Sequence, residues 1–288
     1  MSNSKSNHSV IKSVLYSVLS FFLAVSLFFL GIACIVKFSL FSQDFMMNAM
    51  ASQGYSAMIQ DELKSDLKNL GHASGLTDEF VDKFVDSLDI SGVEYDYVKA
   101  FYSGDNTLVD TATFKQQLYA ALDQYVIDTG MDPEKVSQEN VDYLVEKATS
   151  IYVNDVSIPF FSTIANYVYK YDGPLTILIA GLAVFAAIIA FLIIFTNEFV
   201  HRRYRYLCYS FTTTALSLAV IPTVVFVSGY ITKIGIATRS LYNLFVSYFS
   251  SFFMYFYFAS AVFAVAAIIC FLVFYKRYKR ITGHHSHH

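Results

Sequence analysis

Four long apolar runs divide the sequence, at residues 14–36, 175–196, 207–231 and 252–275. A helix needs about 20 residues to cross a hydrocarbon core of about 30 Å, and each run is long enough. None of the runs contains Asp, Glu, Lys, Arg or His. The hydrophobic pattern therefore predicts four transmembrane helices, with residues 37–174 forming a long insertion between the first and the second.

The insertion has the sequence signals of a bundle of short helices. Apolar residues recur at helical spacing from Phe45 to Leu70 without a proline, which predicts a helix over this stretch. Thr77 is expected to cap a helix that runs through Leu88, and Ser103–Asn106 has the composition of a turn. Further helices are expected over residues 91–102 and 137–155. Another is expected to contain a capping box at Thr113–Gln116 and to run to about Asp128, before Gly130. A last helix is expected from Pro159 to a break at Gly173–Pro174. No stretch alternates as a strand, so we expect the insertion to be all-α.

Acidic and basic residues are segregated along the chain. Between Asp44 and Asp172 lie 22 of the 23 acidic residues and only eight basic ones, which leaves that segment at −14. The rest of the chain carries twelve basic residues and one acid, Glu198, a balance of +11. Segregation of this kind is typical of a membrane protein with its acidic domain on one side and basic segments on the other.

The basic clusters predict an orientation. They lie in residues 1–13, in the link 197–206 and in residues 276–288. The positive-inside tendency places these three segments in the cytoplasm. The insertion 37–174 and a short aromatic loop, 232–251, are then extracellular. We expect an all-α, multi-pass protein of the cell membrane, with its helical extracellular domain between the first and second transmembrane helices.

Composition supports a membrane protein without disulfides. Hydrophobic residues make up 55% of the chain and charged residues 15%. The three cysteines, Cys34, Cys208 and Cys270, lie inside apolar runs and are expected to act as small apolar side chains. With no cysteine in the insertion, its core must come from packing alone.

Two segments leave structural alternatives open. In the third apolar run, hydroxyls (Thr212, Thr213, Thr214 and Ser217) precede Pro222, which predicts either a hinge or pore-lining bend or a kinked structural helix. The segment 232–251 is rich in aromatic residues and is expected either to lie on the bilayer or to pack beneath the acidic domain.

The sequence lacks the common enzyme motifs, such as a Gly-rich phosphate loop, His-Glu-x-x-His or Gly-x-Ser-x-Gly. His72 lies near Ser74 in a Gly-containing stretch and is interpreted as an exposed loop histidine. Asp105, Thr107 and Asp110 have a faint resemblance to a calcium loop but lack its Gly and terminal Glu, so we interpret them as a solvated turn. The histidine-rich residues 284–288 are assigned no function. We therefore expect no catalytic, metal or cofactor site and no nucleic-acid partner.

Three short phrases resemble sequences of a known group. They are Gly75–Val81, Phe101–Asp105 and Val109–Lys115. Together with the order of one anchor, a helical ectodomain and three further spans, they resemble uncharacterised multi-pass membrane proteins of Gram-positive bacteria. That resemblance implies no activity and no site residues.

Two functions from different classes are consistent with the sequence. The first is a non-enzymatic envelope protein whose outer domain binds or senses a partner, held in the lipid bilayer by four helices. The alternative is a subunit of an oligomeric channel or transporter. A hydrated cavity lined by the hydroxyls that precede Pro222 would favour the alternative, whereas an anchor should be packed dry. The sequence does not indicate the oligomeric state.

Overall fold

The computed structural model describes residues 2–104, 109–131, 137–159, 161–197, 200–233, 235–236 and 238–283. Within these ranges every regular element is a helix and there is no strand, as the sequence predicts. The chain divides into two compact units. The apolar unit consists of residues 1–41, 171–234 and 249–288, and the polar unit of residues 42–170 and 235–248.

Four long helices supply the apolar unit. They are α1 (Ser2–Phe38), most of α8 (Phe161–Thr196), α9 (Val200–Ser228) and most of α10 (Arg239–Gly283), with a single 3₁₀ turn, η2 (Ile231–Lys233), after α9. Each contains a segment long and apolar enough to cross a membrane: Lys12–Phe38, Ile164–Thr196, Arg202–Lys233 and Arg239–Lys279. The predicted number of membrane-crossing helices is confirmed at the level of length and hydropathy.

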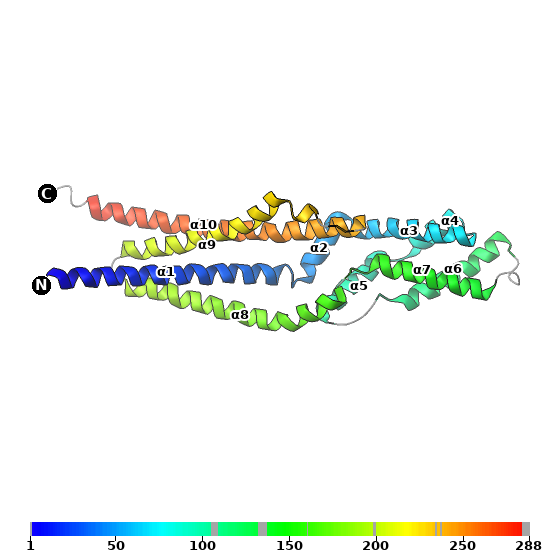
Figure 1. The fold of residues 1–288 in the computed structure, drawn as a ribbon, viewed down its shortest axis with the longest axis horizontal. Helices are drawn as coiled ribbons and strands as arrows, with labels where there is room; N and C mark the ends of the chain where they lie inside the picture. Colours follow the sequence, from blue (N-terminus) through cyan, green and yellow to red (C-terminus); the bar gives the residue numbers. More distant parts are fainter. Residues whose placement is uncertain are drawn as a thin grey trace. The chain divides into compact units, whose positions relative to one another are not determined.

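Serine and threonine hydroxyls join α1 to α9, which lie side by side (Figure 1). Ser20 Oγ and Ser210 Oγ are 2.9 Å apart, and Ser210 Oγ also donates to the Ser20 carbonyl at 2.8 Å. Thr214 Oγ1 donates to the Ala24 carbonyl at 3.2 Å. These three hydroxyl side chains are almost fully buried. Small polar residues at a close helix–helix contact are a common device in membrane bundles, because lipid offers hydroxyls no partner.

Similar hydrogen bonds link the other long helices of the apolar unit. Ser26 Oγ donates to the Leu182 carbonyl, which joins α1 to α8, and Ser260 Oγ donates to the Ala215 carbonyl, which joins α10 to α9. An ion pair between Lys37 and Asp172 adds a second link between α1 and α8. The bundle is therefore held by apolar packing together with several specific polar contacts.

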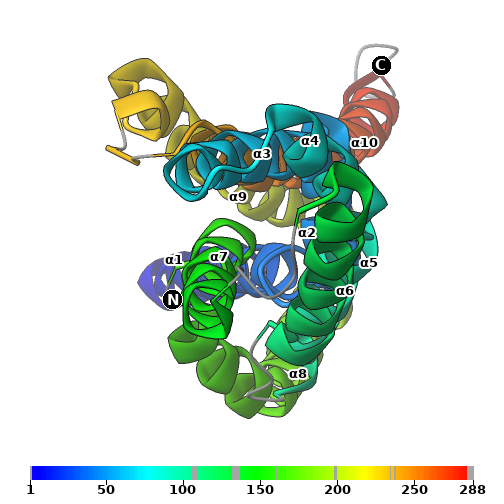
Figure 2. The same cartoon turned by 90° about the vertical axis from the view of Figure 1, so that its right-hand side faces the viewer.

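Six shorter helices form most of the polar unit. They are α2 (Gln43–Gln53), α3 (Tyr55–Ser74), α4 (Asp78–Ser87), α5 (Ile90–Ser103), α6 (Thr111–Thr129) and α7 (Gln138–Val156). Residues 161–170 of α8 and 239–248 of α10 complete the unit. Helix α3 is central, because it contacts α2, α4, α5 and α7; its pairing with α4 is visible in Figure 2.

The core of the polar unit is built on one face of α3. Ile59, Leu63 and Leu67 recur every four residues and are buried against the neighbouring helices. The Phe114 ring of α6 stacks on the Tyr152 ring of α7 with centroids 4.2 Å apart. Burying apolar side chains of this size contributes about 1.5–3 kcal/mol each, so a unit without disulfides has a sufficient source of stability.

Several predicted helix ends are confirmed. Thr77 accepts a hydrogen bond from the Phe80 amide at the start of α4, and Gly104 and Gly130 end α5 and α6. The predicted helix from Phe45 to Leu70 is instead two helices. Gly54, in the left-handed region with a φ of 61°, separates α2 from α3.

Three further expectations about local structure are wrong. The capping box at Thr113–Gln116 does not form, because Asp110 caps α6 one turn earlier by accepting from the amides of Ala112 and Thr113. No break occurs at Gly173–Pro174, since α8 continues through Pro174 as one helix. Proline removes a single amide donor, and a long helix keeps the remaining hydrogen bonds on both sides of it.

The segment 232–251 is the third correction, because it is largely helical rather than a loop. Helix α10 begins at Arg239, and Leu241 and Leu244 are buried in the core of the polar unit. Of the two alternatives for this segment, packing with the acidic domain is the one observed. Phe245 and Tyr248 are partly buried and pack against that core. Apolar residues at helical spacing are also the pattern that an interfacial segment would show.

Candidate functional site

The sequence-derived candidates do not converge on a site. His72 is exposed as expected, but it lies in the last turn of α3 and not in a loop, and its Nε2 is 2.6 Å from Asp78 Oδ1. Asp110 serves as the cap of α6. Asp105, Thr107 and residues 284–288 lie outside the described residues. Within the described chain, no group of three or more His, Cys, Asp or Glu side chains is placed to hold a metal ion.

The hydroxyls that precede Pro222 are divided between two environments. Thr214 is fully buried between α1 and α9 and is hydrogen-bonded to carbonyls on both helices. Thr212 and Thr213 are exposed on the surface of the chain, and Ser217 is half-buried. Pro222 lies inside α9, which continues on both sides of it. Thr214 therefore serves helix packing and does not line a hydrated cavity.

A buried carboxyl, Glu94, is the most unusual polar group of the polar unit. It lies one turn into α5, whose first turn is fixed by Asp89 Oδ1 accepting from the Gly92 amide at 2.9 Å. Helical spacing places it on the same face as Ile90 and Val98, both of which are buried. The Glu94 residue is only 2% exposed. A carboxyl at this depth is rare unless it is paired, because an ionised group is costly to remove from water.

Only one oxygen of Glu94 has a partner. Ser56 Oγ of α3 donates to Glu94 Oε2 at 2.5 Å, whereas Oε1 has no hydrogen-bond partner within the described chain. Burial raises the pKa of Glu94 to about 7, against the opposing effect of the Ser56 hydrogen bond. The carboxyl therefore changes protonation near neutral pH, and its unsatisfied oxygen is the available acceptor.

Glu94 lines a pocket of about 550 Å³ between α2, α3 and the start of α5. Seven of the thirteen lining residues have no polar side-chain group and six have one. The Glu94 pocket is lined by Met47, Met50, Ala51, Gly54, Tyr55, Ser56, Ala57, Gln60, Leu88, Asp89, Ile90, Ser91 and Glu94. Small-molecule sites commonly have volumes of about 300–1,000 Å³ and combine apolar walls with a few polar groups.

The pocket exists because of the glycine that divides the first predicted helix. Gly54 ends α2 and allows α3 to leave in a new direction, and both helices contact α5. Met47 and Met50 of α2 line the pocket together with residues of α3 and of the α4–α5 connection. Sequence reasoning that treated residues 45–70 as one helix had no means to place this pocket.

A group of acids and tyrosines continues inward from the pocket. Tyr55 is 1% exposed and its hydroxyl has no partner within the described chain. Burial, together with the nearby Glu94 and Glu62 carboxyls, raises the pKa of Tyr55. Burial and the charges of Asp66 and Glu62 also raise the pKa of Asp155 to about 6. The interior on this side of the unit therefore has a negative electrostatic environment.

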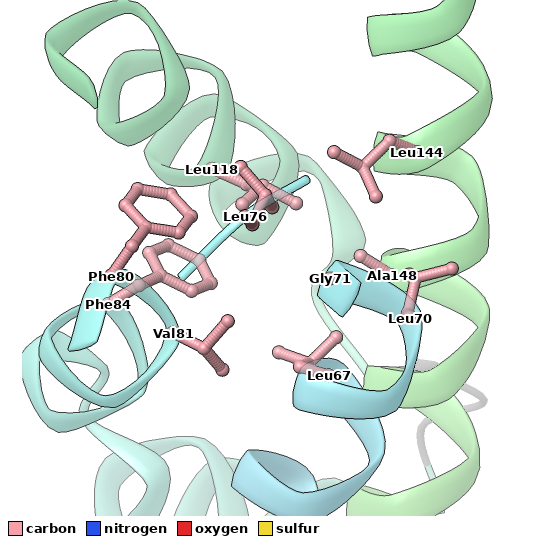
Figure 3. A pocket seen from close by; sticks show the side chains of 10 residues that line it. All are labelled: Leu67, Leu70, Gly71, Leu76, Phe80, Val81, Phe84, Leu118, Leu144 and Ala148. Carbon is pink, nitrogen blue, oxygen red and sulfur yellow. The ribbon is translucent and has the colours of Figure 1, made fainter. Parts of the chain in front are cut away.

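A second cavity of the polar unit is apolar and very small. It has a volume of about 20 Å³ and lies between α3, α4, α6 and α7 (Figure 3). The side chains around it, including Leu67, Phe84 and Leu144, are hydrocarbon. A water needs polar partners as well as space, so this cavity is a packing defect of the core and not a binding site.

Sequence analysis missed Glu94, although a signal was present. Ile90, Glu94, Val98 and Phe101 follow one another at spacings of four, four and three on one helix face. An ionisable residue within an otherwise apolar stripe is the pattern of a buried charge. No family model matches this chain, and no curated protein and no solved structure shows a significant similarity to it.

Proposed function

We propose that this chain is a non-enzymatic, multi-pass protein of the cell membrane whose polar unit lies outside the cell and binds a small ligand in the Glu94 pocket. Binding there serves to sense or capture the ligand. The observation that carries the proposal is the unsatisfied, buried Oε1 of Glu94, a residue that lines a pocket of about 550 Å³. Such a carboxyl destabilises the empty protein, and ionisable groups with shifted pKa values concentrate at functional sites.

Charge supports the orientation. Residues 202–205 and 276–280, with their clustered Arg and Lys, flank the long helices on the side assigned to the cytoplasm. Lys37 follows the first apolar run on the side assigned to the exterior, against the positive-inside tendency. Its ion pair with Asp172 offsets that charge, so Lys37 does not count against the proposed topology.

The helix contacts favour an anchor over a pore. The buried hydroxyls of Ser210 and Thr214 on α9 donate hydrogen bonds to carbonyls of α1. Thr212 and Thr213 face outward from the single chain, so they line no cavity within it. The channel alternative requires these exposed hydroxyls to meet between several copies, and no observation favours that assembly.

Topology is tested by thiol labelling of intact cells. In a background with Cys34, Cys208 and Cys270 replaced by alanine, cysteine is introduced by Ser103→Cys or by Arg277→Cys, both at exposed positions. An impermeant maleimide should label the first variant on intact cells and the second only after permeabilisation. The reverse pattern would show that the polar unit lies in the cytoplasm.

Ligand capture is tested with the full-length protein in lipid nanodiscs. Nanodiscs are incubated with a metabolite extract, and bound small molecules are identified by mass spectrometry. We expect a molecule that is retained by the wild type and by Glu146→Gln, an exposed acid on α7, but not by Glu94→Gln. Ala57→Trp, which places a large ring at an exposed edge of the pocket, should also abolish retention. Equal retention by all four proteins, or by none, contradicts a binding function for the pocket.

A further inference from the structure

We infer that the ligand of the Glu94 pocket is an organic ammonium, a protonated amine with a short apolar body. This inference rests on the proposed binding function and names the chemical class that the pocket selects. It follows from three properties of the pocket: the free acceptor on Glu94, the sign of the surrounding charge, and the apolar walls beside them.

The free acceptor requires a hydrogen-bond donor. Ser56 already donates to Oε2 of Glu94, and Oε1 has no partner in the described chain. An ionised carboxylate accepts hydrogen bonds only, so a ligand that completes this site must bring an N–H or O–H group. A hydrogen bond between two charged groups is the stronger choice, because charge-assisted bonds are roughly twice as strong as neutral ones.

The charges around the pocket select a cation among possible donors. Two of the thirteen described lining residues are acidic, Asp89 and Glu94, and none is Lys, Arg or His. Glu62 and Asp155 act on Tyr55 in the wall, which extends the negative environment inward. An anionic ligand would meet repulsion from all of these groups. A cation would neutralise the charge that makes the ionised form of Glu94 costly.

The remaining walls fit an apolar body of modest size. Met47, Met50, Leu88 and Ile90 line the pocket beside the carboxyl. Methionine side chains are flexible and polarizable, so they adapt to different hydrocarbon shapes. The Oε1 atom itself is shielded from solvent, so side chains that line the pocket must move to bring a ligand nitrogen within hydrogen-bond distance of it.

Ammonium binding must be coupled to the protonation of Glu94. Burial raises its pKa to about 7 in the empty pocket, so a bound cation expels a proton from it at lower pH. Tyr55 on α3 and Asp89 at the start of α5 are the titratable groups that line the pocket with Glu94. Tyr152 on α7 interacts electrostatically with Glu94, and Glu62 and Asp155 interact with Tyr55. Both tyrosine pKa values are raised, so neither becomes charged near neutral pH. Ammonium affinity should therefore fall about tenfold for each pH unit below the pKa of Glu94.

The test compares two probes of nearly the same shape on the full-length protein in nanodiscs. The probes are 4-fluorobenzylamine, which is an ammonium at about pH 8, and 4-fluorobenzyl alcohol, which is neutral. Fluorine NMR measures their binding, with empty nanodiscs correcting for partition into lipid. We expect the amine to bind the wild type and Glu146→Gln equally, and to bind Glu94→Gln at least about tenfold more weakly. The alcohol should bind more weakly than the amine to the wild type.

Other results overturn the inference in distinguishable ways. Equal binding of the alcohol and the amine, if Ala57→Trp abolishes both, shows a pocket that binds ligands but does not select ammonium. Amine binding that survives Glu94→Gln, or no amine binding at about pH 8, removes ammonium as the ligand class. The proposed function is tested separately, by whether the protein retains a small molecule from the metabolite extract.

Discussion

Glu62 of α3 accepts two hydrogen bonds from Ser240, one from its amide at 3.0 Å and one from its Oγ at 2.5 Å. The two residues are 178 positions apart in the sequence. Ser240 is the second residue of α10 and is fully buried. The carboxylate therefore satisfies an amide at the start of a 45-residue helix, where the helix dipole also favours a negative charge.

Removing this contact should loosen the first turns of α10. We expect Glu62→Gln and Ser240→Ala each to destabilise the polar unit by about 1.5–3 kcal/mol, the usual contribution of hydrogen bonds to a charged group. Ser240→Ala removes the Oγ donor but keeps the amide donor, and Glu62→Gln removes the negative charge. The double variant should cost less than the sum of the two, because both substitutions weaken the same contact. Hydrogen exchange at residues 239–248 of the full-length protein measures the effect. Additive losses, or unchanged exchange in that segment, would refute the coupling.

The pH dependence of stability provides a second prediction. Burial raises the pKa of Glu94 from 4.5 to about 7, so the folded protein retains a proton that the unfolded chain has lost between these values. The stabilising contribution of this proton is complete below pH 4.5 and is lost as the pH rises through about 7. A shift of this size corresponds to roughly 3 kcal/mol.

Glu94→Gln removes that titration, which allows the contribution to be isolated. The stability of the wild type relative to Glu94→Gln should decline by up to roughly 3 kcal/mol as the pH increases from about 4 to about 8. Thermal unfolding of both proteins in nanodiscs across this range measures the difference. The titration of other acids, including Asp155, is common to both proteins and cancels. A difference that does not vary with pH would show that Glu94 is not buried in the way described.

A third prediction concerns the glycine that ends α5. Gly104 has a φ of 71°, and a Cβ added to it would lie 2.5 Å from Tyr169 Cγ of α8. Gly130 has a similar φ of 66°, but a Cβ there would meet no atom within 4 Å. Gly130→Ala should therefore cost only the backbone strain of about 1–2 kcal/mol. Gly104→Ala should cost roughly 1–3 kcal/mol more, because Tyr169 or its backbone must move. Equal melting temperatures for the two variants would argue against this close approach.

The hydroxyl contacts between α1 and α9 lead to a fourth prediction. Ser210→Ala removes the bonds to Ser20 and should destabilise the apolar unit by about 0.6 kcal/mol, with an upper value near 1.7 kcal/mol. Thr213→Val, at an exposed position on the same helix, should have no measurable effect. Steric-trap or denaturant unfolding in bicelles compares the two. A larger loss for Thr213→Val would indicate that its hydroxyl has a partner in another copy of the chain.

Sequence reasoning succeeded where a signal was local. Uninterrupted apolar runs predicted the four long helices, and Thr77, Gly104 and Gly130 marked helix ends because capping depends on neighbouring residues only. It failed at Gly173–Pro174, where the fate of a proline depends on whether the surrounding helix is long enough to tolerate it.

The candidate site could not be predicted from local sequence signals. The Glu94 pocket depends on the angle that Gly54 introduces between α2 and α3 and on the packing of both against α5. Likewise, Leu241 and Leu244 of α10 join a core made mainly from residues 46–158. Apolar spacing shows that such residues are buried but does not identify the partner, since many apolar faces fit one another about equally well.

The pairing of Ser20 with Ser210 has a consequence for the timing of biogenesis. The two serines are separated by 190 residues, which a ribosome takes roughly 10–40 s to synthesise. If α1 enters the bilayer as it emerges, its buried hydroxyls lack their α9 partners for that whole interval. The polar unit is also incomplete until residues 235–248 have been made. Both units therefore complete their packing late in synthesis, and truncation of the chain before α10 leaves each of them without part of its contacts.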